Sequence, residues 1–200
     1  MRKALLLLCA LLLTMLIPIE SILAQTNKVD KQERKARREL LMSLQNEKEI
    51  NVIMDMSNVI ILGQSESDFI YRESTIYGDE WADLWENEYK PSIYSDFLVA
   101  LNSLMYDFGY SIRFGTSYNT KYQIRLVVNK ISGSGHTSMF VCIEDSKLEK
   151  ELYSFSIKGR GGQYGSTVNL IGDGFKRAGK DLAIRMNKIF ICGKASSFWN

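Results

Sequence analysis

Residues 122–157 read YQIRLVVNKISGSGHTSMFVCIEDSKLEKELYSFSI, and this stretch decides the fold. Apolar and polar side chains alternate in three runs, which include Tyr122, Met139 and Tyr153. A period of two is the spacing of a β-strand that has one covered face. The segments between the runs, residues 132–136 and 144–150, are polar and typical of turns. We therefore predict three consecutive antiparallel strands.

Two segments with helical spacing flank these strands. The first begins at Pro91, which suits the first turn of a helix, and ends at Gly109. The second carries an apolar stripe over residues 175–189, and we expect Asp173 to cap its N-terminus. Further strands are predicted in residues 50–62, 69–71 and 110–114. The order predicts an α+β fold: an antiparallel sheet of about four to five strands, with two main helices packed on one face.

The N-terminus has the pattern of a secretory signal peptide. Residues 1–3 carry two positive charges, residues 4–17 are uncharged and nearly all apolar, and Pro18 breaks the run before a small residue, Ala24. The apolar run is shorter than the roughly 20 residues that a membrane-spanning helix needs. We expect residues 1–24 to be removed, although an uncleaved anchor is an alternative. The mature chain is then exported, to the periplasm, the outer membrane or the medium, without a transmembrane segment.

Residues 25–49 form a charged leader helix or linker, and residues 50–200 form a single α+β domain in this interpretation. The basic half of the leader and its narrow apolar stripe over residues 31–44 allow two interpretations. One is a solvated helix. The other is peripheral contact with an anionic membrane surface or an acidic partner.

Composition narrows the function classes. The formal net charge is +2, which argues against general binding of nucleic acid, because that requires a strongly basic face. Cys142 and Cys192 remain after the leader, and an oxidising compartment permits a disulfide between them. Two separate buried thiols are the alternative.

A glycine-rich segment precedes the last helix, over residues 159–167. Its glycine spacing fits neither the phosphate loop nor the dinucleotide fingerprint. Arg160, Gly161 and Gly162 remain candidates for binding an anion beside the helix N-terminus. The alternative is a structural loop in which glycines permit a close turn. We expect no cofactor and no metal, since the single histidine, His136, has no partner at ligand spacing.

An acidic, aromatic segment covers residues 79–89. Trp81 and Trp85 share a helical face and are candidate binding residues for a carbohydrate or a peptide. The alternative is a solvated acidic helix with its aromatic side chains in the core. The acids of residues 79–88 also permit an exported hydrolase with paired carboxylates.

The second half of the chain resembles a family. Residues 161–166, 169–175 and 178–183 fit the pattern GGxxGS…NLxGDGFxxAGxxLA, which is similar to small exported proteins of Gram-negative bacteria. The order of elements is similar to the α/β domains of the TolB N-terminal region and of the curli-secretion lipoprotein. The resemblance implies a role in binding or assembly in the cell envelope and carries over no catalytic residue. Our first hypothesis is therefore a non-catalytic envelope module with a protein partner, and the alternative is the hydrolase.

Overall fold

The structure is a computed structural model of the 200-residue chain. It describes residues 35, 39–40, 42–148 and 150–195, with side chains up to Ile191. The chain divides into two units, residues 1–40 and 41–200, and nearly all described residues belong to the second. The predicted signal peptide and most of the predicted leader helix lie outside the described residues. Of the leader, residues 42–45 are helical.

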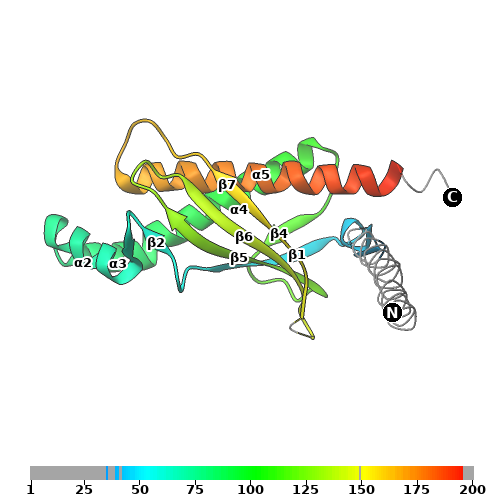
Figure 1. The fold of residues 1–200 in the computed structure, drawn as a ribbon, viewed down its shortest axis with the longest axis horizontal. Helices are drawn as coiled ribbons and strands as arrows, with labels where there is room; N and C mark the ends of the chain where they lie inside the picture. The colour runs from blue at the N-terminus through cyan, green and yellow to red at the C-terminus, as the bar shows by residue number, and fades with distance from the viewer. Residues whose placement is uncertain (1–34, 36–38, 41, 149, 196–200) are drawn as a thin grey trace, which may run out of the picture. The chain divides into compact units, whose positions relative to one another are not determined.

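The described residues form one sheet of seven strands (Figure 1). The strands are β1 (Glu49–Asp55), β2 (Ile60–Ile61), β3 (Gln64–Ser65), β4 (Arg113–Gly115), β5 (Tyr122–Ile131), β6 (Thr137–Asp145) and β7 (Lys150–Gly159). The predicted antiparallel run of β5, β6 and β7 is confirmed, with Leu126 opposite Val141 and Val141 opposite Phe155.

The prediction of a purely antiparallel sheet is wrong. Strand β1 pairs in parallel with β5 on one side and with β4 on the other, and β2 is also parallel to β5. Parallel neighbours require a crossover connection, and the helices between β2 and β4 supply it. The broader α+β class is supported, since several helices accompany this mixed sheet.

The helices are α2 (Glu66–Tyr77), α3 (Glu80–Leu84), the π-helix η1 (Trp85–Tyr89), α4 (Lys90–Asp107) and α5 (Thr167–Ala195). Figure 1 shows α5 lying along the sheet with α4 beside it. Pro91 occupies the first turn of α4, as predicted, and Gly109 follows its end with a φ of 83°. None of the helices in the described ranges is long and apolar enough to cross a membrane.

Two local predictions are wrong. Residues 69–71 lie in α2 and not in a strand, because Ser65 accepts a hydrogen bond from the Asp68 N–H and starts a helix there. Asp173 lies inside α5, which begins six residues earlier at Thr167. The glycines that flank Asp173 do not end the helix. Gly174 lets the helix approach its neighbour, since a Cβ there would stand 2.0 Å from the Gly135 carbonyl oxygen.

The core lies between α4, α5 and one face of the sheet. Its fully buried side chains include Phe97, Leu101, Leu126, Val141 and Phe175. The helices cross closely, because a Cβ on Gly179 would stand only 2.4 Å from the Phe97 carbonyl oxygen.

The other face of the sheet carries polar and partly exposed residues. There Arg125 on β5 pairs with Glu144 on β6 at 2.9 Å. Glu144 also accepts a hydrogen bond from Gln123, at 2.8 Å. Phe140 on the same face is 48% exposed.

Candidate functional site

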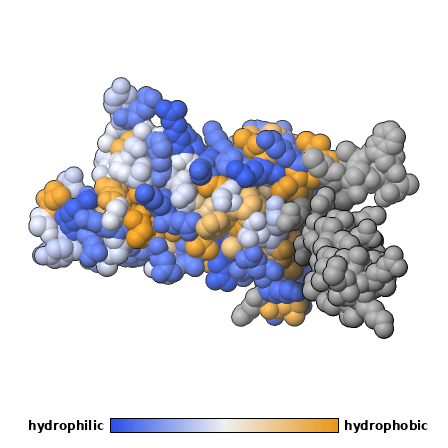
Figure 2. Space-filling view, viewed as in Figure 1, coloured by the Kyte–Doolittle hydropathy of each residue, from blue (hydrophilic) through white to orange (hydrophobic). Residues whose placement is uncertain are grey.

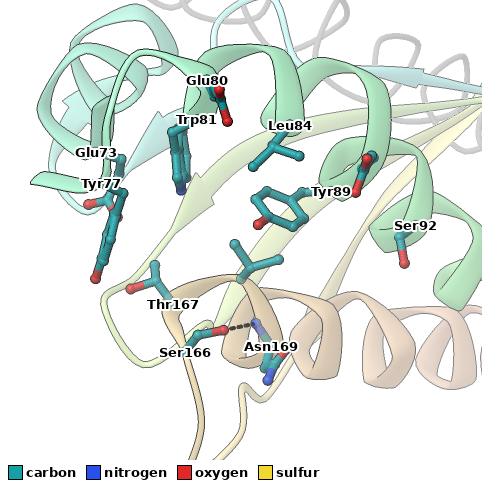
Figure 3. Close-up of a pocket in the computed structure, with 12 residues that line it drawn as sticks. Glu73, Tyr77, Glu80, Trp81, Leu84, Tyr89, Ser92, Ser166, Thr167 and Asn169 are labelled. Carbon is teal, nitrogen blue, oxygen red and sulfur yellow. Dashed lines mark hydrogen bonds between the residues drawn. The ribbon is translucent and has the colours of Figure 1, made fainter. Parts of the chain in front are cut away.

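A groove of about 700 Å³ lies between helices α2, α3, η1 and the start of α4 on one side and the first turn of α5 on the other (Figure 3). The α5 side of the groove consists of residues 166–169. The helical side consists of three aromatic residues, three carboxylates and two further residues: Tyr77, Trp81, Tyr89, Glu73, Glu80, Glu88, Leu84 and Ser92. The groove therefore joins two segments that the sequence analysis singled out separately, the acidic aromatic segment and the end of the glycine-rich segment.

The aromatic wall of the groove is built by packing around Phe69 of α2. Trp81 and Trp85 lie four residues apart, so they share a helix face, and their rings stack at 5.6 Å with an interplanar angle of 10°. Phe69 meets both rings edge-on, at 5.4 and 5.2 Å. Trp85 is completely buried behind Trp81, which is 6% exposed. Of the two predicted tryptophans, Trp81 lines the groove and Trp85 supports it.

The π-helix η1 extends this wall. The Lys90 N–H bonds to the Trp85 carbonyl, one residue further than in an α-helix. The ring of Tyr89, the last residue of η1, lies 6.1 Å from that of Trp81. Short π segments inside helices are frequent at functional sites. Nothing in the sequence pattern of this segment indicated one.

The two indole N–H groups have different partners. Trp85 donates from Nε1 to Glu66 Oε1 at 2.9 Å, and the Lys90 ammonium pairs with the same oxygen at 3.0 Å. Burial works against the charge of Lys90, but its contacts with Glu66 and Glu86 outweigh that effect and raise its pKa. The Trp81 N–H, in contrast, has no hydrogen-bond partner among the described residues. Figure 3 shows the nitrogen end of its ring directed into the groove, on the side of Thr167.

This indole N–H is the strongest indication of a ligand. The Trp81 side chain is 6% exposed, and its Nε1 is not among the described buried polar atoms that lack a partner, so the N–H opens into the groove. The observation favours an acceptor that comes from outside the chain.

The groove is negatively charged. Glu73 is 5% exposed and pairs with Arg72 at 2.6 Å, so its charge is compensated. Glu80 and Glu88 have no ion-pair partner among the described residues. None of the described residues that line the groove is a lysine, arginine or histidine. At the end of the molecule that carries α2 and α3, hydrophilic and hydrophobic side chains lie next to each other on the surface (Figure 2).

The first turn of α5 contributes hydrogen-bond donors. Ser166 caps the helix, because its Oγ accepts from the Asn169 N–H at 3.3 Å. The N–H groups of Thr167 and Val168 have no partner within the helix, as in the first turn of any α-helix. The groove thus has donors on its α5 side and carboxylate acceptors on its helical side.

The predicted anion-binding residues lie outside the lining of this groove. Arg177 donates to the carbonyl of Arg160 at 3.0 Å and to that of Gly161 at 2.7 Å. A Cβ on Gly161 would stand 1.7 Å from the Ser134 carbonyl oxygen, and one on Gly162 would stand 2.5 Å from an Asp173 carboxylate oxygen. These contacts agree with the structural-loop alternative, and anion binding there stays a prediction.

His136 contributes to this loop, which the sequence analysis missed. Its Nδ1 accepts the Gly161 N–H at 3.2 Å, so the histidine helps to hold the glycine segment in place. The only signal in the sequence was its position within a Ser-Gly turn, and this could not indicate the partner.

The remaining candidates are placed as follows. Of the predicted acids, Glu80 and Glu88 line the groove. Glu86 faces a neighbouring cavity of about 420 Å³ and pairs there with Lys90 at 3.2 Å. The hydrolase stays a prediction.

The Cys142 thiol has no disulfide partner among the described residues and is half-buried, on the sheet face opposite the core. Burial, with help from Glu151, raises its pKa to about 11. The side chain of Cys192 lies outside the described residues, and the pairing of the two cysteines stays a prediction.

The fold and the groove define the class of protein: an α+β domain with a mixed sheet and an acidic, aromatic groove at one end of its long helix. No protein-family model matches the chain, and no curated protein matches it significantly. The predicted resemblance to small exported proteins is therefore not confirmed by a family match.

Solved structures match weakly. The PelC dodecamer from Paraburkholderia phytofirmans is 10% identical, with a TM-score of 0.35 over 68% of this chain and 89% of that chain. Protein XCC0632 from Xanthomonas campestris, of the DUF330 family, is 11% identical, with a TM-score of 0.30 over 50% of this chain and 63% of that chain. Both come from Gram-negative bacteria, and neither likeness is strong enough to assign a family.

Proposed function

We propose that this chain is an exported, non-catalytic module of the bacterial envelope, and that it binds a protein partner through the groove between η1 and the start of α5. The export signal in residues 1–24 supports the compartment. The Trp81 N–H, which has no partner among the described residues and opens into the groove, supports the site, and it is the observation that carries the proposal. Tyrosine and tryptophan are also the residues that most often anchor protein interfaces, because they bury a large area with few rotatable bonds.

Binding is favoured over hydrolysis by the contacts of the groove. A hydrolytic nucleophile needs a base within hydrogen-bond reach. In the described part of the chain, no hydroxyl that lines the groove is bonded to a carboxylate or to a histidine. Ser166, the one lining hydroxyl with a hydrogen bond, caps α5.

Site-specific crosslinking tests the proposal. A photoreactive amino acid replaces Tyr77, which lines the groove and is 68% exposed. The matched control replaces Tyr106, which is 78% exposed on α4 and does not line the groove. In envelope extracts, we expect a crosslinked protein from position 77 and none from position 106. Equal products at both positions, or a product only at position 106, would rule out the groove as the binding site.

A further inference from the structure

We propose that the groove binds an extended, basic stretch of polypeptide: two lysine or arginine side chains meet Glu80 and Glu88, and a backbone carbonyl accepts the Trp81 N–H. This inference rests on the proposed function, which does not by itself specify the chemistry of the partner. Three properties of the groove lead to it, namely its charge, its donors and its spacing.

The charge of the groove selects a cation. Glu73 is neutralised by Arg72, so the carboxylates left to a ligand are those of Glu80 and Glu88. The described lining offers neither of them a cationic side chain. A basic side chain would also lie beside Tyr77 and Tyr89, whose rings attract a cation that comes within about 6 Å of the ring centre. An anionic ligand would be repelled from the same surface.

The donors of the groove require an acceptor on the same ligand. The Trp81 N–H points into the groove, and the first turn of α5, whose N–H groups have no partner within the helix, lies on the opposite wall (Figure 3). A metal ion or a simple amine brings no acceptor and would leave the indole unpaired. A polypeptide brings a carbonyl at every residue as well as the basic side chains. A neutral saccharide could satisfy the donors, but it would make no use of the charge.

The spacing of the carboxylates fits an extended chain. Glu80 and Glu88 lie eight residues apart along consecutive helical segments, which is about 12 Å along the axis at about 1.5 Å per residue. In an extended chain, residues i and i+4 point to the same side and lie about 13 Å apart. We therefore expect the two basic side chains of the ligand to be four residues apart.

Peptide binding tests this inference. The probe is a fluorescent nine-residue peptide of alternating threonine and valine with lysines four positions apart. The control is the same peptide with both lysines acetylated, which removes the charges and keeps the backbone. Binding to the mature chain is followed by fluorescence anisotropy at low and at raised salt. We expect acetylation to weaken binding at least tenfold, and raised salt to weaken binding of the lysine peptide.

Three variants locate the contacts. The double variant Glu80→Gln, Glu88→Gln should lose the preference for the lysine peptide. Glu86→Gln lies on the same helical stretch, outside the groove, and should bind as the wild type does. Trp81→Phe keeps an aromatic ring but removes the N–H, so it should weaken binding of both peptides several-fold.

The outcomes separate the two proposals. Three results would overturn the basic-polypeptide inference. In the first, both peptides bind equally well, and in the second neither binds. In the third, a neutral oligosaccharide competes for the groove and acetylation has no effect. The groove would still stand as the binding site if position 77 crosslinks to a partner and position 106 does not. Loss of that crosslinking difference overturns the proposed function itself.

Discussion

Replacement of Gly179 by alanine tests how closely α4 and α5 cross. The crossing matters for the groove because it positions α5, whose first turn forms one wall of the groove. In an exposed helix, glycine to alanine stabilises by about 1 kcal/mol, because alanine is the better helix former. Here we expect the opposite sign. The new Cβ would stand 2.4 Å from the Phe97 carbonyl oxygen, whereas ordinary contacts begin near 3.4 Å.

The magnitude follows from that distance. The two backbones must separate by about 1 Å, and overpacking of this kind costs about 1–3 kcal/mol. After the gain of about 1 kcal/mol in helix propensity is subtracted, Gly179→Ala should destabilise by up to about 2 kcal/mol. Gly172→Ala in the same helix is the matched control. Its Cβ would meet only the end of the Asp96 side chain, at 3.3 Å, and a carboxylate can rotate away. We expect that variant to be neutral or up to about 1 kcal/mol more stable.

Urea unfolding of the mature chain, followed by far-ultraviolet circular dichroism, measures both variants. For a domain of this size, a loss of up to about 2 kcal/mol at Gly179 corresponds to a melting temperature lower by up to about 8 °C. If Gly179→Ala is as stable as Gly172→Ala or more stable, the helices do not cross at Phe97 and the reasoning fails.

Three further predictions concern other parts of the chain. Burial alone would raise the pKa of Glu144, but hydrogen bonds from Arg125 and Gln123 and the charge of Arg125 outweigh burial and lower it. The ion pair between Arg125 and Glu144 therefore stabilises the fold fully at a pH above the ordinary pKa of a glutamate. The stabilisation is lost as the pH falls through the lowered pKa. Arg125→Met should therefore lower the free energy of unfolding by about 1–2 kcal/mol at pH 7, which is less than the loss of a fully buried pair because Arg125 is 40% exposed. In urea unfolding, the difference in stability between variant and wild type should disappear in acid. A difference that does not change with pH would contradict this prediction. Alkylation of Cys142 by iodoacetamide should be slow at pH 8 and accelerate only above about pH 10, because the pKa of the thiol is about 11; fast reaction at pH 8, measured by mass spectrometry, would show that the thiol is not buried as described. After expression in a Gram-negative host, the intact mass of the envelope fraction should correspond to a chain that begins at Gln25, and a full-length chain in the cytosol would refute export.

Local patterns predicted the strands and helices that are defined by their own periodicity. Residues 122–157 form three antiparallel strands, and the helix after Pro91 is present, because side-chain alternation and turn residues are contained within each segment. The parallel pairing of β1 with β5 could not be predicted in this way. It depends on residues about 70 positions apart and on a crossover that the sequence does not mark.

The wrong local predictions had competing signals. Phe69, Ile70 and Tyr71 are consecutive apolar residues, which favoured a strand. Ser65 with Glu66 and Asp68 is the pattern of a helix N-terminus, and that pattern correctly predicts α2. Asp173 between two glycines resembled a cap, but it lies inside α5, and Gly174 serves close packing against Gly135, which only the tertiary structure reveals.

The candidate site was predicted in part. The acidic aromatic segment was singled out from sequence, and five of its residues, Glu80, Trp81, Leu84, Glu88 and Tyr89, line the groove. Which tryptophan faces the groove was not predictable, because it depends on Glu66, 19 residues away, as the partner of Trp85. The part played by residues 166–169 was also hidden, since it requires the fold to bring α5 against η1.

The indole N–H signals of Trp81 and Trp85 provide the most direct measurement of the central claim, that the Trp81 N–H is the unused donor of a binding groove. Nitrogen-15 labelling gives one indole NMR signal for each of the three tryptophans in the sequence, and the variants Trp81→Phe and Trp85→Phe assign the two signals of interest. We predict that the Trp85 proton exchanges slowly with water, because it is buried and bonded to Glu66. The Trp81 proton should exchange quickly in the free chain, and should shift and become protected when the lysine peptide is added. The account would be contradicted if the Trp81 proton were already protected from exchange with water in the free chain. It would also be contradicted if the Trp81 signal did not shift when a partner that crosslinks at position 77 is bound.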